Sequence, residues 1–272
     1  MLYRAMVGKT FADYEILGKL AQGGMAAIYL AIDDNGNHYA LRVLLPQLES
    51  DRTYVRRFSW GCEVLSHMEH ANIVRVFKHG EALDHHYAVL EYVPGPNLKE
   101  RILRRDPELI PNRLKLLVGM ASALAHIHQR GYLHLDFKPE NVMVPKTFDP
   151  KLIDLDLAIK RPSEPKRLPT RSGTPSYLAP EQIAREPVDE RADIFAFGIT
   201  AYEMIAGYPP ITGESPREIL EKYANFKSNA RPLHADVPDL PIHIETVIFK
   251  CLEKDVTRRY PSMGLVARDL QS

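Results

Sequence analysis

Five residues about a third of the way along the chain, Val93-Pro94-Gly95-Pro96-Asn97, separate two stretches with different hydrophobic patterns. Two prolines around a glycine favour neither helix nor strand. Before this break, short apolar runs alternate with turn signals such as Asn35-Gly36, which is typical of antiparallel hairpins. Strands are expected at 14–20, 25–33, 38–44, 74–79 and 86–92, and one helix at 53–68. The pattern predicts a five-stranded antiparallel sheet plus one helix.

Beyond the break the pattern becomes helical. Residues 113–128 repeat apolar side chains three or four positions apart, as on one face of a helix. Similar stretches follow at 194–205, 216–226, 242–252 and 263–270. Between residues 161 and 180, five prolines exclude regular structure and predict a long surface loop of the kind that binds or regulates. The second half is therefore expected to be mainly helical, and the chain as a whole to be α+β.

Composition excludes several classes of function. Lys plus Arg and Asp plus Glu each number 35, so no generally basic surface for nucleic acid is expected. No run approaches the roughly 18 apolar residues of a membrane span, and no signal peptide begins the sequence. Cys62 and Cys251 fit neither a zinc-ligand spacing nor a disulfide scaffold. We expect a cytoplasmic protein without a membrane span or a nucleic-acid partner.

Two segments after the helix at 113–128 carry a chemical pattern. Residues 134–143 read His-Leu-Asp-Phe-Lys-Pro-Glu-Asn-Val-Met, and residues 151–158 read Lys-Leu-Ile-Asp-Leu-Asp-Leu-Ala. The first resembles the catalytic loop of the protein kinase superfamily, H-R-D-x-K-x-x-N, and the second resembles its D-F-G metal-binding segment. Ordered motifs of this kind are far more specific than any one of them alone.

Further matches follow in the family's order. Residues 173–181 resemble the substrate-docking loop and A-P-E motif, and residues 193–198 resemble the central buried helix. Arg259 stands where the family has the arginine that pairs with the A-P-E glutamate, here Glu181. The resemblance runs from about Tyr14 to Leu270, and it implies that these two side chains form an ion pair.

The resemblance implies a bilobal protein-kinase-like fold in a single domain over residues 1–272. The small lobe is expected at about 1–92, the hinge at about 91–97 and the C-terminal lobe at about 98–272. The run Lys138-Pro139-Glu140-Asn141 and the G-T-P-x-Y segment are similar to those of bacterial-type, eukaryotic-like Ser/Thr kinases rather than Tyr kinases.

The same resemblance implies ATP and Mg²⁺ as cofactors. Phosphoryl transfer needs a carboxylate near the attacking hydroxyl, cations for the phosphate charge and oxygen ligands for the metal. By the family pattern, Asp136 is the catalytic carboxylate and Lys138 points toward the transferred phosphate. Asn141 and Asp154 supply the metal ligands. The acceptor is then a hydroxyl of a protein substrate.

The family's phosphate-holding ion pair is changed on both sides. Tyr39-Ala40-Leu41-Arg42 matches the V-A-I-K strand with arginine in place of lysine, and the helical glutamate falls on Gly61. Glu63 lies about 200° further around a helix, so it is not expected to replace the missing partner. Glycine costs a helix up to about 1 kcal/mol relative to alanine, which predicts a mobile or irregular helix at this point. Changing Arg42 to Lys together with Gly61 to Glu is expected to rebuild the family pair.

The nucleotide pocket follows from the same alignment. The glycine-rich loop is altered but keeps Gly23 and Gly24, whose amides are expected to approach phosphates. Main-chain groups of Glu91 and Val93 are expected to meet the edge of the base. The adenine pocket is expected to be lined by apolar side chains: Leu20, Ile28, Ala40, Leu90 and Met143.

The D-F-G segment itself reads Asp154-Leu155-Asp156, and Leu135 replaces the arginine of H-R-D. The loss of that arginine predicts that a phosphate on the activation segment is not read. Asp156 has three interpretations: an extra carboxylate near Mg²⁺, a replacement partner for Arg42, or a solvated or turn-capping aspartate.

Two functions remain open at this point. The first is ATP- and Mg²⁺-dependent phosphorylation of Ser or Thr in proteins, which the residues at 136, 138, 141 and 154 favour. The alternative is a pseudokinase, a nucleotide-binding or scaffolding module that regulates a partner protein. The residues that favour it are Arg42, Gly61, Ala21 and Leu135. The groups that touch the transferred phosphoryl are kept and those that position nucleotide are changed, so the enzyme is preferred.

Overall fold

The computed structural model describes residues 6–168, 173–213, 215–224 and 230–272. The chain divides into two compact units. The first contains Met1–Glu69, Ile73–Pro94 and Asp154–Asp156, and the second contains His70–Asn72, Gly95–Ile153 and Leu157–Ser272. Asp154–Asp156 thus belongs to the first unit although it is distant from the rest of that unit in sequence. In the described part of the chain, no helix combines the length and apolar character needed to cross a membrane.

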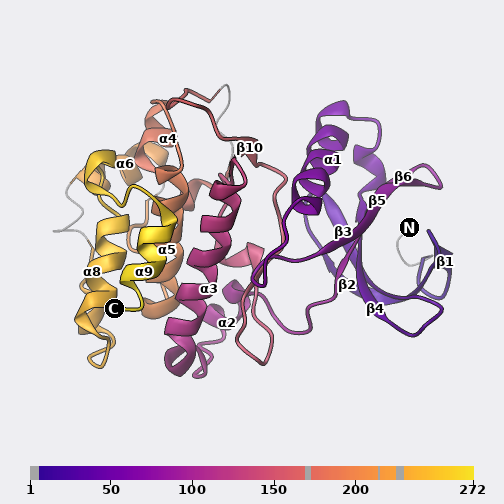
Figure 1. Ribbon diagram of the computed structural model, residues 1–272, viewed down its shortest axis with the longest axis horizontal. Coiled ribbons are helices and arrows are strands. Elements are labelled where there is room, and N and C mark those ends of the chain that lie inside the picture. Colours follow the sequence, from indigo (N-terminus) through magenta and orange to yellow (C-terminus); the bar gives the residue numbers. More distant parts are fainter. Residues whose placement is uncertain (1–5, 169–172, 214, 225–229) are drawn as a thin grey trace. The chain divides into compact units, whose positions relative to one another are not determined.

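The first unit is an antiparallel sheet with one α-helix (Figure 1). Its strands run in the order β1-β2-β3-β4-β6-β5. Their bounds are β1 (Thr10–Phe11), β2 (Tyr14–Gln22), β3 (Ala26–Ile32), β4 (His38–Leu44), β5 (Val76–Ala82) and β6 (His85–Glu91). The expected sheet is confirmed except for its strand number, which is six. The additional β1 has only two residues, too few for an alternating pattern, and its turn uses Ala12 and Asp13 at positive φ.

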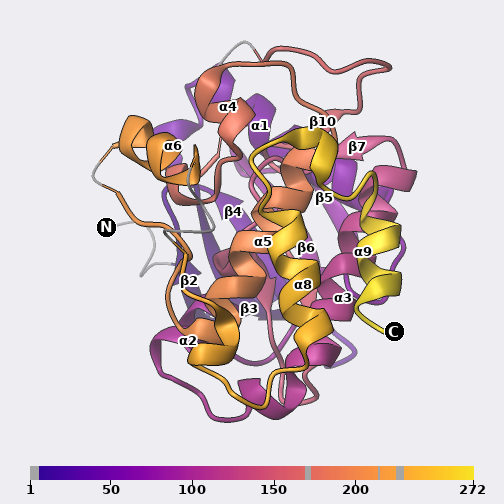
Figure 2. The ribbon, with the colours of Figure 1, turned by 90° about the vertical axis from the view of Figure 1, so that its left-hand side faces the viewer.

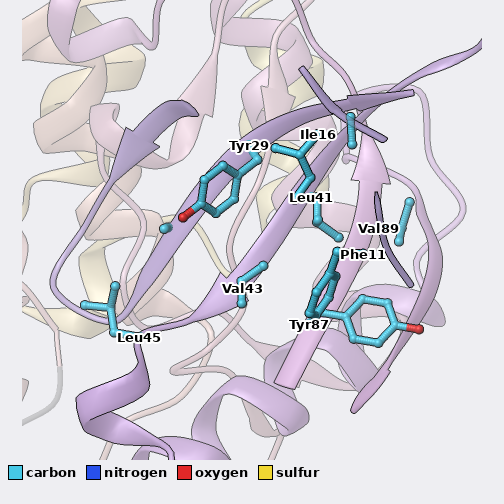
Figure 3. Close-up of a cluster of buried hydrophobic side chains, with 10 residues drawn as sticks. Phe11, Ile16, Tyr29, Leu41, Val43, Leu45, Tyr87 and Val89 are labelled. Carbon is cyan, nitrogen blue, oxygen red and sulfur yellow. The ribbon is translucent and has the colours of Figure 1, made fainter. Parts of the chain in front are cut away.

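One face of this sheet carries an apolar cluster, which Figure 3 shows. Alternate residues of β3, β4 and β6 point into it because side chains alternate between the two faces of a strand. Phe11 meets Tyr87 edge to face, with ring centroids 5.5 Å apart. The cluster contains Phe11, Ile16, Ala27, Tyr29, Ala31, Leu41, Val43, Leu45, Tyr87 and Val89. The intervening residues of the central strands therefore face the opposite side of the sheet.

Helix α1 (Arg52–Ser66) packs against β5 and β6. The Asp51 side chain caps its start by accepting a hydrogen bond from the Thr53 amide at 2.8 Å. Its buried residues include Phe58, Gly61 and Leu65, which lie on one face at helical spacing. The helix is continuous through Gly61, so the expectation of an irregular helix is wrong. Burial of this face stabilises the helix enough to offset the low helix propensity of glycine.

The second unit is mainly helical. Its helices are α2 (Leu98–Leu103), α3 (Leu109–Gln129), α4 (Pro180–Ala184), α5 (Arg191–Ala206), α6 (Pro216–Ala224), α8 (Ile242–Cys251) and α9 (Met263–Asp269). Helix α5 is buried along almost its whole length and contacts α3 and α8, while α9 packs on α3 and α8 (Figure 2). The five expected helices are confirmed, although Phe226, the expected end of one of them, lies outside the described residues.

Short strands and 3₁₀ turns connect these helices. Strand β7 (Tyr132–Leu133) pairs with β10 (Ile159–Lys160), and β8 (Val142–Met143) pairs with β9 (Lys151–Leu152). The turns are η3 (Pro139–Asn141), η4 (Pro175–Tyr177), η5 (Leu233–Ala235) and η6 (Val256–Arg258), and η2 (Pro46–Leu48) lies in the first unit. Apart from η4 and an isolated bridge at Lys166, the described residues between 161 and 179 lack regular structure, as the prolines predict.

Candidate active site

A buried aspartate of α5, Asp193, holds the start of the loop at residues 134–141 through hydrogen bonds. Asp193 accepts hydrogen bonds from the amides of His134 and Leu135, both at 2.8 Å, and from His128 Nε2 at 2.8 Å. Burial alone would raise the pKa of Asp193, but the hydrogen bond and charge of His128 outweigh it, and the pKa lies below its usual value. A carboxylate that is ionised inside the unit can hold several donors at once. It therefore fixes the main chain directly before Asp136.

Asp136 and Lys138 lie together, and a third side chain completes the group. Lys138 Nζ donates to Asp136 Oδ2 at 2.7 Å and to Thr174 Oγ1 at 2.6 Å. The Thr174 hydroxyl donates to Asp136 Oδ1 at 3.0 Å, and the Thr174 amide donates to the same oxygen at 2.9 Å. The Thr174 hydroxyl thus lies between the Asp136 carboxylate, to which it donates a hydrogen bond, and the Lys138 ammonium, from which it accepts one.

Sequence reasoning did not single out Thr174. It lies 36 residues after Lys138 in a stretch that the prolines make irregular, and spacing alone cannot place it on the loop. The available signal was Gly173. This glycine has φ +111°, and a Cβ there would lie 2.8 Å from the Leu135 oxygen. A glycine that passes so close to the loop at residues 134–141 restricts the position of the residue that follows it.

Asn141 is buried beside the same loop. Its Nδ2 donates to the Asp136 main-chain oxygen at 3.0 Å, which fixes the orientation of the amide group. In the first unit, the Asp154 carboxylate accepts the Asp156 amide at 2.8 Å. Amide and carboxylate oxygens are the ligands that Mg²⁺ prefers, so both residues fit that ion.

Protein side chains alone do not form a complete metal cage here. Within the described ranges, no three or more His, Cys, Asp or Glu side chains are grouped so as to hold a metal ion. This is compatible with Mg²⁺, which usually takes one or two protein ligands and completes its shell with substrate phosphates and water. The donor chemistry supports a nucleotide-bound metal rather than a structural one.

In the first unit, four of the predicted nucleotide residues share one face of the sheet. Ile28 on β3 is directly opposite Arg42 on β4, and Ala40 on β4 is directly opposite Leu90 on β6. Opposite residues in antiparallel strands point to the same side. This is the face that does not carry the apolar cluster of Figure 3. Three predicted adenine-lining residues, Ile28, Ala40 and Leu90, thus share this face with Arg42.

The remaining predicted residues lie around these strands or in the other unit. Gly23 and Gly24 are exposed at the β2–β3 turn, where the Gly23 amide donates to the Ala26 oxygen at 2.9 Å. Leu20 is exposed near the end of β2. The Glu91 amide donates to the Arg75 oxygen at 2.8 Å, so a contact of Glu91 with a base would use its carbonyl. Two more residues complete the predicted set: Val93, buried after β6, and Met143, half-buried in β8 of the second unit.

Arg42 is buried and paired with Asp156. Its Nη1 donates to Asp156 Oδ1 at 2.8 Å, and its Nη2 donates to Asp156 Oδ2. Asp154 Oδ2 lies 3.9 Å from the same Nη2, and the guanidinium lies 4.9 Å from the centroid of the Phe58 ring. Burial opposes the charge of Arg42, but the two carboxylates raise its pKa above the usual value. Of the three interpretations of Asp156, replacement partner for Arg42 is the one found, and a solvated aspartate is wrong.

Gly61 makes this arrangement possible. A Cβ at Gly61 would lie 2.2 Å from Asp156 Oδ1 and 2.9 Å from its Cα. Real Cβ atoms do not approach other atoms so closely, so any side chain at 61 must displace Asp156. The expectation that Gly61→Glu with Arg42→Lys simply rebuilds the family pair is therefore wrong. Glu63 points elsewhere, as predicted, and its carboxylate lies 3.6 Å from His79 and 3.8 Å from His67.

The predicted ion pair behind the docking segment is confirmed. Arg259 Nη1 donates to Glu181 Oε1 at 2.7 Å, and Nη2 donates to Oε2 at 2.8 Å. Both side chains are buried. The pair joins the start of α4 to the residue after η6 and thereby anchors the chain that follows Thr174.

A model of the protein kinase domain matches residues 14–270, and the chain belongs to the protein kinase family. The serine/threonine-protein kinase pkn2 of Myxococcus xanthus is 34% identical over 256 residues, which are 90% of this chain and 30% of that protein. The serine/threonine-protein kinase PrkC of Bacillus subtilis is 31% identical over 271 residues, 98% of this chain and 41% of that protein. The chain thus spans less than half the length of these relatives.

Proposed function

We propose that this protein transfers the γ-phosphoryl group of ATP to Ser or Thr hydroxyls of protein substrates. The observation that carries the proposal is the Thr174 hydroxyl between Asp136 and Lys138. This contact supports the proposal, because it places an aliphatic hydroxyl in hydrogen-bond contact with both side chains. Membership of the protein kinase family and the names of the relatives agree with this activity. The comparisons give no support to a pseudokinase.

The residues have the following proposed roles. Asp136 orients the acceptor hydroxyl and accepts its proton as the phosphoryl group arrives. Lys138 places a positive charge on the transferred phosphoryl oxygens, as its contact with a hydroxyl oxygen suggests. Asn141 and Asp154 each offer an oxygen to Mg²⁺. The metal, when bound, neutralises phosphate charge and fixes the nucleotide.

Nucleotide binding is proposed for the face of the sheet that carries Arg42. Ile28, Ala40 and Leu90 are its apolar contacts with the base, and Met143 of the second unit is proposed to join them. Main-chain groups of Gly23 and Gly24 are proposed to contact the phosphates. Main-chain groups of Glu91 and Val93 are proposed to contact the base. Arg42 supplies the positive charge that the family's lysine supplies.

Action in the reducing cytoplasm is part of the proposal. Cys62 and Cys251 are both buried free thiols, and burial raises the pKa of Cys62 to about 12. Protonated, buried thiols are inert and require no oxidising compartment.

The test is transfer of radiolabelled phosphate from ATP to casein and to the protein itself. Asp136→Asn is expected to lower kcat by about 10²- to 10⁴-fold while the Kd for Mg·ATP stays nearly unchanged, because the carboxylate acts on the acceptor. Asp149→Asn, an exposed aspartate of the same unit, is the matched control and should keep full activity. Equal turnover by the wild type and Asp136→Asn would overturn the proposal, as would binding of ATP without transfer.

A further inference from the structure

We infer that Asp156 is a positioning residue, which holds Arg42 on the segment that carries Asp154 instead of on helix α1. The inference deepens the proposed function, since it concerns how the nucleotide-binding cation is placed. It rests on contacts within the first unit alone.

The first step is the geometry of the pair. Both guanidinium nitrogens of Arg42 meet the two oxygens of one carboxylate, an arrangement that fixes the plane as well as the position of the guanidinium. Arg42 is 7% exposed and Asp156 is 8% exposed. A buried pair with two parallel hydrogen bonds has little freedom, so wherever the Asp156 carboxylate lies, Arg42 follows. A lysine could not match both oxygens in this way.

The second step is the link to the metal-binding candidate. The Asp156 amide donates to Asp154 Oδ1 at 2.8 Å, while Arg42 Nη2 lies 3.9 Å from Asp154 Oδ2. The orientation of Asp154 and the position of Arg42 are therefore set by the same three-residue segment. The positive charge of Arg42 neutralises the negative charge of Asp156. The negative charge of Asp154 is then available to a metal cation. Asp154, the proposed metal ligand, and Arg42, the proposed phosphate-binding residue, are thus held in a fixed arrangement relative to each other.

The third step is that helix α1 supplies no acidic partner for Arg42. The helix passes close to Asp156 at Gly61, which has no side chain. The acidic residue two positions on, Glu63, contacts His67 and His79 instead. Helix α1 supplies the Phe58 ring and the Cys62 thiol beside Arg42, and both are uncharged. Removing the charge of Glu63 on α1 should consequently leave Arg42 in place.

The experiment compares Asp156→Asn with Glu63→Gln, each alone and with Arg42→Gln. The Kd of Mg·ATP is measured by calorimetry at a temperature where circular dichroism shows every variant folded. Asp156→Asn is expected to raise the Kd at least fivefold in the wild-type background and less than twofold beside Arg42→Gln. Contacting residues couple by about 2- to 150-fold on this scale. Glu63→Gln is expected to change the Kd less than twofold.

A second readout needs no nucleotide. Cys62 lies beside Arg42 and is 1% exposed, so a thiol reagent reaches it only when this region opens. Asp156→Asn should speed its labelling severalfold, as followed by mass spectrometry, while Cys251 in the second unit serves as the internal control. An equal effect of Asp156→Asn on the Kd with and without Arg42 would overturn the inference. So would faster Cys62 labelling at an unchanged Kd. Failure of the wild type to bind ATP would instead overturn the proposed function.

Discussion

At the scale of single residues, position 61 has the most direct effect on the site. Gly61→Ala is expected to destabilise the protein by about 1–3 kcal/mol, because the added Cβ overlaps Asp156 in a packed region. Helix propensity alone predicts the opposite sign, a gain of up to about 1 kcal/mol. The free energy of unfolding of Gly61→Ala, measured in urea, decides between these two expectations. The control is Gly264→Ala in α9, where the nearest atom to a Cβ is 3.9 Å away, and this variant should be neutral or more stable.

Thr174 offers a second test at this scale. Thr174→Val removes a hydroxyl that bonds both Asp136 and Lys138, and hydrogen bonds to charged groups contribute about 1.5–3 kcal/mol. We expect kcat/KM for casein to fall at least tenfold. Thr174→Ser keeps the hydroxyl and should retain most of the activity. Equal loss in both variants would contradict a role for the hydroxyl and indicate that the methyl group matters.

At the scale of elements, the C-terminal end of α3 carries a pH-sensitive pair. The rings of His126 on α3 and His70 lie 5.1 Å apart. Burial lowers the pKa of both below the usual value, and the charge of His126 adds to the effect on His70. The unfolded chain therefore takes up protons more readily than the folded one, so stability is present above the unfolded pKa of about 6.5 and is lost as the pH falls.

His126→Asn is accordingly expected to lessen the loss of unfolding free energy between about pH 7 and pH 5. The measurement is a series of urea unfolding curves across this range. The wild type, measured in the same series, is the reference. A pH profile of His126→Asn that matches the wild type would show that the pair does not titrate in this way.

Most elements could be predicted from sequence because their apolar periods are long and regular. Short ones could not. β1 has two residues and α4 has five, too few for a period to be detected, and α4 begins at one of the prolines that mark the loop. At the site, the resemblance to the family singled out Asp136 and Lys138, whose side chains are in contact, and it implied the Glu181–Arg259 pair, which the structure contains. The partner of Arg42 stayed open because 114 residues separate it from Asp156, and only the fold brings such residues together.

At the scale of the whole molecule, the two units differ in what they contribute. The proposed catalytic residues Asp136 and Lys138 lie in the helical unit, and Arg42 with its partner lies in the sheet unit, although that unit takes three of its residues from far along the chain. Binding that requires the folded chain stabilises it. Mg·ATP at about 100 times its Kd is therefore expected to raise the free energy of unfolding by about 2.7 kcal/mol.

Thermal scans with Mg·ATP, with ATP and EDTA, and without ligand measure this effect. Asp154→Asn should reduce the part that depends on the metal, since it removes one of the proposed oxygen ligands. The absence of a shift at millimolar Mg·ATP, checked by calorimetry, would contradict nucleotide binding altogether.

The close approach of Gly61 to Asp156 also restricts the mutational routes open to this chain. Placing the carboxylate on the helix with a lysine at 42 takes changes at positions 42, 61 and 156, and two of the three possible first steps are unfavourable. A glutamate introduced at 61 overlaps Asp156, while removal of Asp156 leaves the Arg42 charge buried without its bidentate partner. Both of these first steps are expected to cost stability, which opposes an exchange of one arrangement for the other. A chain that has adopted this one tends to keep it.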